Sequence, residues 1–104
     1  MTIIQARWLL IDDIRNIKGI DKIARTYDEG LNAIHNEGPW ECIIFDHDLG
    51  DKQIPERTGY DLMCELERHP ELIPNNIILV TQNPVGRQKM EVLKNKLLRR
   101  KHGI

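Results

Sequence analysis

The sequence has no long hydrophobic run. No stretch approaches the roughly 20 apolar residues that a helix needs to cross a bilayer, so we expect no membrane-spanning segment. The N-terminus, MTIIQARWLLIDDIR, has no basic region ahead of a long apolar stretch, and Asp12 and Asp13 interrupt its apolar residues. A signal peptide is therefore not expected, and the pattern favours a cytoplasmic protein.

Cysteine is also scarce. Cys42 and Cys64 are the only two, and they form neither a disulfide framework nor a metal-ligand spacing. Each sits among apolar residues, which is typical of a small buried side chain in a reducing compartment. The 104 residues are enough for one domain with a single core, spanning 1–104. Any active site must be built on this scaffold or shared with a partner.

Charge is unevenly distributed behind a net charge of −1. Residues 1–83 carry 8 basic and 15 acidic side chains, whereas residues 84–104 carry 7 basic and one acidic. A basic end can contact nucleic acid or an acidic partner, or it can form the solvated face of a last helix. Because no aromatic residues alternate with these cations, the solvated helix is favoured and specific DNA binding is not expected.

The hydrophobic pattern predicts alternating strands and helices. Short apolar runs at 8–11, 22–26, 42–45 and 77–80 are typical of buried parallel strands, and amphipathic stretches at 28–36, 59–69 and 84–100 predict helices. Asn83 is placed to cap the last helix, with Pro84 at its first position. This alternation predicts an α/β sandwich. Only about ten residues separate the first two strands, so a short helix or a turn is expected there.

Polar residues follow three of the predicted strands. The set is Asp12, Asp13, Asp46, His47, Asp48, Thr81 and Asn83. The carboxyl ends of parallel strands share one edge of the sheet, where ligands bind in open α/β folds. Carboxylates crowded there either have raised pKa values or are neutralised by a hard cation. We expect Mg²⁺ or Mn²⁺, with Asp12, Asp13, Asp46 and Asp48 as ligands.

A phosphate group is the expected companion of such an ion. Thr81 and Asn83 are candidate phosphate contacts beside the start of the last helix, and Arg87 and Lys89 lie in its first turns. Alternatively, the aspartates are only caps and turn formers, a role that suits Asp. Carboxylates after two strands with a hydroxyl after a third favour the metal–phosphate pocket.

The segments LLIDD, IIFDHDLG, TGYDL and ILVT together resemble the receiver domain of response regulators, over about residues 7–82. The resemblance implies that Asp12 and Asp13 are the acidic pair that holds Mg²⁺, that Asp46 is the phosphoacceptor and that Thr81 supplies the hydroxyl. Asp48 stands where receivers supply a backbone carbonyl to the metal, and Gly50 where they usually have proline.

The resemblance implies a receiver (flavodoxin-like) three-layer sandwich, shortened to about four parallel strands in the order 2-1-3-4. The fifth strand of receivers is missing, and with it a lysine that contacts the phosphoryl group; Arg87 or Lys89 is the expected replacement. The segments DHDLG and NPVG together resemble a divergent branch, the cyclic-phosphate-processing receiver-like family.

This family implies metal-dependent processing of phosphate esters, with a phosphate-containing small molecule or an RNA end as partner. Asp46, His47 and Thr81 are then the candidate catalytic residues. A metal ion would polarise a phosphoryl oxygen, or Asp46 would attack phosphorus. His47 is an acid, base or ligand, or else a histidine hydrogen-bonded under the adjacent loop. Two further hypotheses stay open, a phosphoacceptor switch and a non-catalytic module that binds a protein partner.

Overall fold

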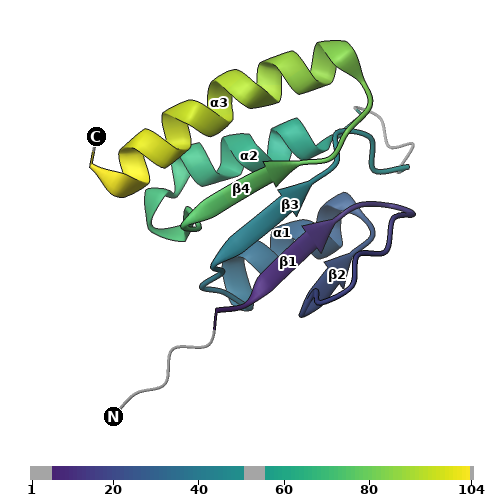
Figure 1. Cartoon of the computed structure of the whole chain (residues 1–104), viewed down its shortest axis with the longest axis horizontal. Helices are drawn as coiled ribbons and strands as arrows, with labels where there is room; N and C mark the ends of the chain where they lie inside the picture. Colours follow the sequence, from purple (N-terminus) through teal and green to yellow (C-terminus); the bar gives the residue numbers. More distant parts are fainter. Residues whose placement is uncertain (1–5, 51–55, 104) are drawn as a thin grey trace.

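The computed structural model describes residues 6–50 and 56–103, and the predicted 1–104 domain extends beyond these. Four strands and three α-helices follow one another as predicted (Figure 1). The elements are β1 (Trp8–Ile11), β2 (Lys22–Ala24), α1 (Tyr27–Asn36), β3 (Cys42–Phe45), α2 (Gly59–Arg68), the 3₁₀-helix η1 (Pro70–Leu72), β4 (Asn76–Leu79) and α3 (Pro84–His102). The sequence did not predict η1, and the predicted fourth strand begins one residue too late.

The strands form a single parallel sheet in the order β2-β1-β3-β4, which confirms the predicted topology. Leu10 of β1 lies between Ile23 of β2 and Ile44 of β3, and Ile44 in turn lies beside Ile78 of β4. Because all four strands run in the same direction, their carboxyl ends meet at one edge (Figure 1). In this respect the chain has the expected receiver-like α/β fold.

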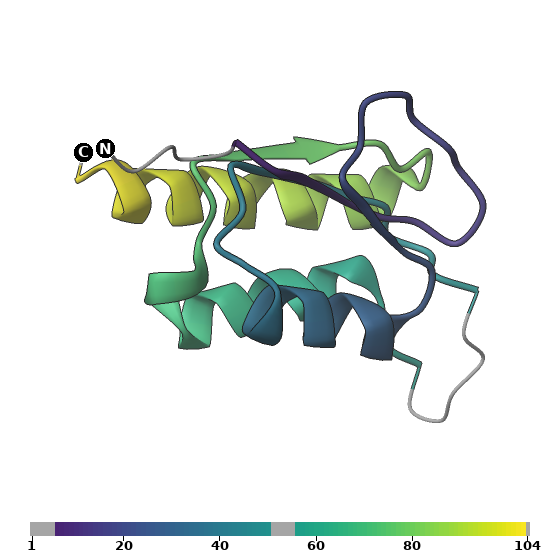
Figure 2. The same ribbon diagram turned by 90° about the horizontal axis from the view of Figure 1, so that it is seen from below.

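The helices all contribute to the core on one face of the sheet. Residues Leu9, Ile11, Ile43 and Phe45 point to this face and form one cluster with apolar residues of α1, α2 and α3. Figure 2 shows α1 and α2 side by side below the sheet. Burying a leucine or isoleucine side chain contributes about 1.5–3 kcal/mol, so this face dominates the stability of the fold.

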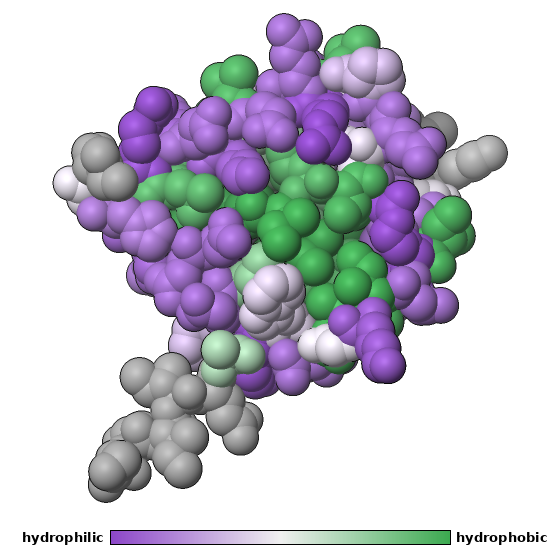
Figure 3. All heavy atoms as spheres, viewed as in Figure 1, coloured by the Kyte–Doolittle hydropathy of each residue, from purple (hydrophilic) through white to green (hydrophobic). Residues whose placement is uncertain are grey.

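The opposite face has no helix in the part of the chain that the structure describes. Leu10, Cys42 and Ile44 form its small buried cluster, which Ile17 and Ile20 of the β1–β2 connection partly cover. Figure 3 views this face and shows an apolar area in its centre. The arrangement therefore has two layers where three were expected. The physical reason is the short link after β1, which adopts turns and lies over the sheet as a loop (Figure 2).

Side-chain caps fix where α1 and α3 begin. Thr26 accepts a hydrogen bond from the Glu29 N–H at the start of α1. Asn83 accepts one from the Gly86 N–H at the start of α3, with Pro84 at the first position, as predicted. No helix in residues 6–50 or 56–103 is both long and apolar enough to span a membrane.

Candidate functional site

Three aspartates meet at the carboxyl edge of the sheet. Asp12 directly follows β1 and Asp46 directly follows β3, and the Asp46 N–H donates to the Ile11 carbonyl at 2.9 Å. One carboxylate oxygen from each of Asp12, Asp13 and Asp46 lies within 4.8 Å of the others. The topology thus brings together three of the four carboxylates that the sequence predicts as metal ligands.

Asp12 is fully buried and has several hydrogen-bond partners. Its Oδ1 accepts from the backbone N–H groups of Ile14 and Arg15, at 3.0 and 2.9 Å. Its Oδ2 pairs with the Arg15 guanidinium at 2.8 Å. Asp12 therefore forms the turn after β1, as the alternative interpretation of the sequence suggested, and it also faces the acidic cluster.

Arg15 is a cation of this site that the sequence analysis missed. Its Nη1 donates both to Asp12 and to the Val80 carbonyl at the end of β4, the latter at 3.0 Å. The Arg25 guanidinium donates a hydrogen bond to the backbone carbonyl of Arg15 at 2.7 Å and so helps to hold this turn in place. The only sequence signal was the spacing of three residues between Asp12 and Arg15, which allows an ion pair across a turn. Arg15 thus connects the acidic cluster to the end of β4.

Asp46 is half-buried at the centre of the site. Burial is the main cause that raises the pKa of its carboxyl group, and the negative charge of Asp12 raises this pKa further. Hydrogen bonds from the His47 N–H, at 2.8 Å, and from the Thr81 hydroxyl act in the opposite direction. Asp46 therefore carries an uncompensated electrostatic cost that a cation would relieve.

Two glycines allow backbone to approach the aspartates closely. Gly50 has a φ of +71°, and a Cβ there would lie 2.9 Å from Oδ2 of Asp13. Proline cannot adopt this φ, which explains why this chain lacks the proline usual in receivers. Gly59 begins α2 against the loop after β3, and a Cβ at this position would overlap the carbonyl oxygen of Asp46.

His47 and Asp48 pair with each other beside the acidic cluster. Nδ1 of His47 lies 2.9 Å from Oδ1 of Asp48, whose side chain is 60% exposed, and the His47 ring packs against Gly86 at the start of α3. In this conformation the Asp48 carboxylate is outside the group of three. The His47 ring holds the loop after β3 to α3.

The predicted phosphate contacts separate into two groups. Thr81 is buried, and its hydroxyl accepts from the Asn83 N–H at 3.1 Å while contacting Asp46. The Arg87 guanidinium lies nearby and donates to the Thr81 carbonyl at 3.3 Å. By contrast, the Lys89 ammonium lies 5.8 Å from the Tyr60 ring centroid and lines a groove between α2 and α3. Thr81, Asn83 and Arg87 are thus placed at the end of β4, and Lys89 is not.

Oxygen ligands of this number and charge suit a hard divalent cation. Mg²⁺ and Mn²⁺ prefer carboxylate, carbonyl and water oxygens, and they are commonly held by a few carboxylates together with a phosphate. Asp13 and Asp46 are partly exposed, so an ion has access to them, whereas Asp12 is reached only from within the cluster. The three aspartates therefore fit the predicted metal.

Comparison with known proteins assigns the chain to one family. A family model described as the cyclic-phosphate processing receiver domain matches residues 7–96. This segment contains all four strands, the acidic cluster and most of α3. No curated protein and no solved structure matches the chain.

Proposed function

The chain belongs to the cyclic-phosphate processing receiver domain family, and from this membership and its acidic cluster we propose that it processes phosphate esters at a divalent metal. Asp12, Asp13 and Asp46 hold Mg²⁺ or Mn²⁺ in this proposal. The substrate is a cyclic phosphate of a nucleotide or of an RNA end. The observation that carries the proposal is the convergence of three carboxylate oxygens within 4.8 Å of one another at the ligand-binding edge of the sheet.

The electrostatics of Asp46 support a metal at this position. Its carboxyl group has a raised pKa because it is half-buried and faces other carboxylates, so its ionised form is poorly stabilised by the chain alone. When bound, the metal supplies a positive charge that stabilises the ionised aspartates and polarises a phosphoryl oxygen. Asp46 would then either serve as ligand only while water attacks phosphorus, or attack phosphorus itself; in both cases one ring oxygen leaves as an alcohol, and in the second case water then cleaves the acyl phosphate.

Groups at the end of β4 orient the phosphate in this proposal. The Thr81 hydroxyl is already directed to Asp46, and the Asn83 side chain caps α3 beside it. Because that cap takes the Gly86 N–H and Pro84 has no N–H, the first turn of α3 offers little free backbone to an anion. Side chains of Thr81, Asn83 and Arg87 therefore take the larger part. His47 is a positioning residue here, since its ring is directed to Asp48.

A phosphoacceptor switch is the second candidate function. The hydrogen bond between Asp46 and Thr81 favours it, because it brings together the two residues that the receiver resemblance matches to the phosphoacceptor and the hydroxyl. In this case Asp46 keeps the phosphoryl group rather than passing it to water. Both functions would use the same metal site. They differ in whether the phosphate ester is turned over.

We would test both functions by ³¹P NMR of the purified protein with Mg²⁺ or Mn²⁺. One sample receives a 2′,3′-cyclic nucleotide and another receives acetyl phosphate. Asp46→Asn is the test variant, and Asp28→Asn is the matched control because the Asp28 side chain is 67% exposed in the first turn of α1 and is not one of the three clustered aspartates. We expect the cyclic-phosphate signal to disappear with the wild type and Asp28→Asn, and to persist with Asp46→Asn.

The alternatives give different spectra. A protein-bound acyl phosphate without loss of the cyclic phosphate identifies the phosphoacceptor switch. Equal turnover by Asp46→Asn and the wild type contradicts the site itself. If the cyclic phosphate persists and no acyl phosphate forms, at metal concentrations that saturate the protein, both functions are rejected and the protein-binding module of the sequence analysis is left.

A further inference from the structure

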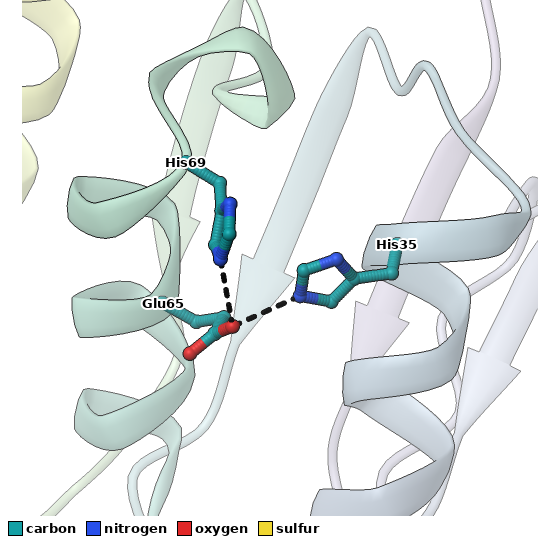
Figure 4. A group of neighbouring side chains, drawn as sticks. All are labelled: His35, Glu65 and His69. Atoms are coloured by element: carbon teal, nitrogen blue, oxygen red, sulfur yellow. Dashed lines mark hydrogen bonds and ion pairs between the residues drawn. The ribbon is translucent and has the colours of Figure 1, made fainter.

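A second cluster of metal-binding side chains lies away from the acidic edge. His35, in the last turn of α1, and His69, at the C-terminal end of α2, both point to Glu65 in the last turn of α2 (Figure 4). Nε2 of His35 lies 3.0 Å from Oε1 of Glu65, and Nε2 of His69 lies 3.3 Å from the same oxygen. One atom from each residue lies within 4.8 Å of the others.

We infer that His35, Glu65 and His69 form a binding site for a zinc-like divalent cation. Zinc bonds of about 2.0–2.1 Å to nitrogen and oxygen give neighbouring ligands about 3.3 Å apart in a tetrahedron. The two nitrogen–oxygen separations at Glu65 are close to this value. Two imidazoles and one carboxylate are a donor set that favours Zn²⁺ and its neighbours over Mg²⁺.

The surroundings of Glu65 leave one of its oxygens to the histidines. Arg68 contacts the other oxygen, Oε2, at 2.6 Å through Nη2 and at 3.2 Å through Nε. This pairing fixes the carboxylate with Oε1 turned toward the two rings. The Arg68 side chain is 62% exposed, so solvent screens its charge from an ion at Oε1.

The environment of His69 fits a ligand that binds through Nε2. Oε1 of Glu71 lies 3.6 Å from Nδ1 of His69, so both ring nitrogens have a carboxylate near them. Histidine ligands commonly direct their second ring nitrogen to a carboxylate, which fixes the tautomer. Metal binding at Nε2 requires the proton to be on Nδ1, where Glu71 favours it.

The three side chains are partly exposed, so water molecules can also bind an ion held between them. The Glu65 side chain is 16% exposed, while those of His35 and His69 are 31% and 43% exposed. The three protein ligands therefore lie at the surface with an open side, and water completes the coordination. The ion would connect α1 to α2, at the opposite end of these helices from the acidic cluster.

Hydrogen bonds alone also explain two histidines around one carboxylate, and glutamine variants separate the two cases. His35→Gln and His69→Gln keep an N–H donor for Glu65 but remove the imidazole ligand. His102→Gln is the matched control, because His102 hydrogen-bonds to the Asn75 carbonyl, outside the cluster. Asp46→Asn removes a ligand from the acidic cluster, the other group that could take zinc.

We would titrate the untagged protein with ZnCl₂ by calorimetry and record the visible spectrum of its Co²⁺ form. We expect one tight site in the wild type, His102→Gln and Asp46→Asn, with the intense visible bands of tetrahedral Co²⁺. Zinc affinity should fall at least about tenfold in His35→Gln and in His69→Gln, because each loses a direct ligand. Equal affinity in these variants and the wild type overturns the inference, as does loss of the tight site in Asp46→Asn alone or absence of binding to the wild type.

Discussion

The two ends of the helical layer carry carboxylates in opposite electrostatic situations. At the carboxyl edge of the sheet, three aspartates lie together, and the Arg15 guanidinium pairs with one of them, Asp12. At the other end of α1 and α2, a single glutamate has two imidazoles and a guanidinium around it. The pKa of Asp46 is raised mainly by burial, whereas that of Glu65 is lowered mainly by the hydrogen bond from Arg68.

The difference matches the two kinds of cation that we propose for these clusters. An oxygen-only cluster with excess negative charge favours a hard ion, and a nitrogen-rich cluster favours zinc and similar metals. Burial of the Asp46 charge is unfavourable, whereas the Glu65 carboxylate is paired with its own neighbours.

Gly59→Ala should damage the acidic edge most. A Cβ at this position would overlap the Asp46 carbonyl oxygen, so α2 or the loop after β3 must move. We expect a loss of about 3 kcal/mol in the free energy of unfolding, as for a severe overpacking change. Urea denaturation measures it, with Gly30→Ala as the comparison, because the nearest atoms to a Cβ at Gly30 are side-chain atoms of Leu62 and Ile11, at 2.9 Å or more, rather than backbone. A loss at Gly59 no larger than at Gly30 would contradict the close packing.

Asp12→Ala should destabilise the fold by about 2–3 kcal/mol, because it leaves the turn N–H groups and Arg15 without their acceptor. The measurement is again the free energy of unfolding at neutral pH. Arg15→Ala should also be destabilising, because it leaves the fully buried Asp12 carboxylate without its counterion. If Asp12→Ala is as stable as the wild type, Asp12 is not the structural member of the cluster.

Asp46→Asn should have the opposite sign and raise stability in the absence of metal, because it removes the cost of burying the Asp46 charge and its repulsion from Asp12; solvent screens this partly exposed group, so the gain should stay below about 1 kcal/mol. Millimolar Mg²⁺ should then raise the melting temperature of the wild type and have little effect on the variant. Thermal unfolding with and without Mg²⁺, with EDTA as the metal-free reference, measures both effects. A variant that Mg²⁺ stabilises as much as the wild type would remove Asp46 from the metal site.

The pH dependence of the unfolding free energy should show a smaller difference, between Asp46 at one end and Glu65 at the other. A raised pKa at Asp46 means that the metal-free fold gains stability as pH falls through that pKa, so the advantage of Asp46→Asn should shrink on acidification. A lowered pKa at Glu65 contributes stability at neutral pH that is lost as pH falls through it. The deficit of Glu65→Gln should therefore also shrink, but at a lower pH. Unfolding free energies of the three proteins between neutral pH and pH 3 provide the check.

Local pattern was enough to predict most of the fold. The strands at Trp8–Ile11 and Cys42–Phe45 have the predicted bounds, because their apolar runs are continuous and their ends are marked by polar residues. The sheet order followed from the receiver resemblance. The short link after the first strand correctly predicted a turn there, but the three-layer arrangement that the resemblance implied was wrong, because no helix covers that face of the sheet in residues 6–50 or 56–103.

The candidate site was predictable where residues directly follow strands. Asp12, Asp46 and Thr81 meet because strand register places them there. Arg15, Lys89 and Asp48 depend on where long or exposed side chains turn, and no spacing rule determines this. The His35–Glu65–His69 cluster could not be predicted either, because it forms only where α1 packs against α2. The pattern of neither helix specifies that contact.

The ion pair between Arg15 and Asp12 also has a consequence for how the protein matures. The most buried carboxylate of the acidic edge has an internal counterion, so the chain can complete its fold before any metal arrives. In the proposed function, folding and metal loading are then separate events. The supply of the ion, rather than the folding of the chain, would then determine how many molecules are active at a given time.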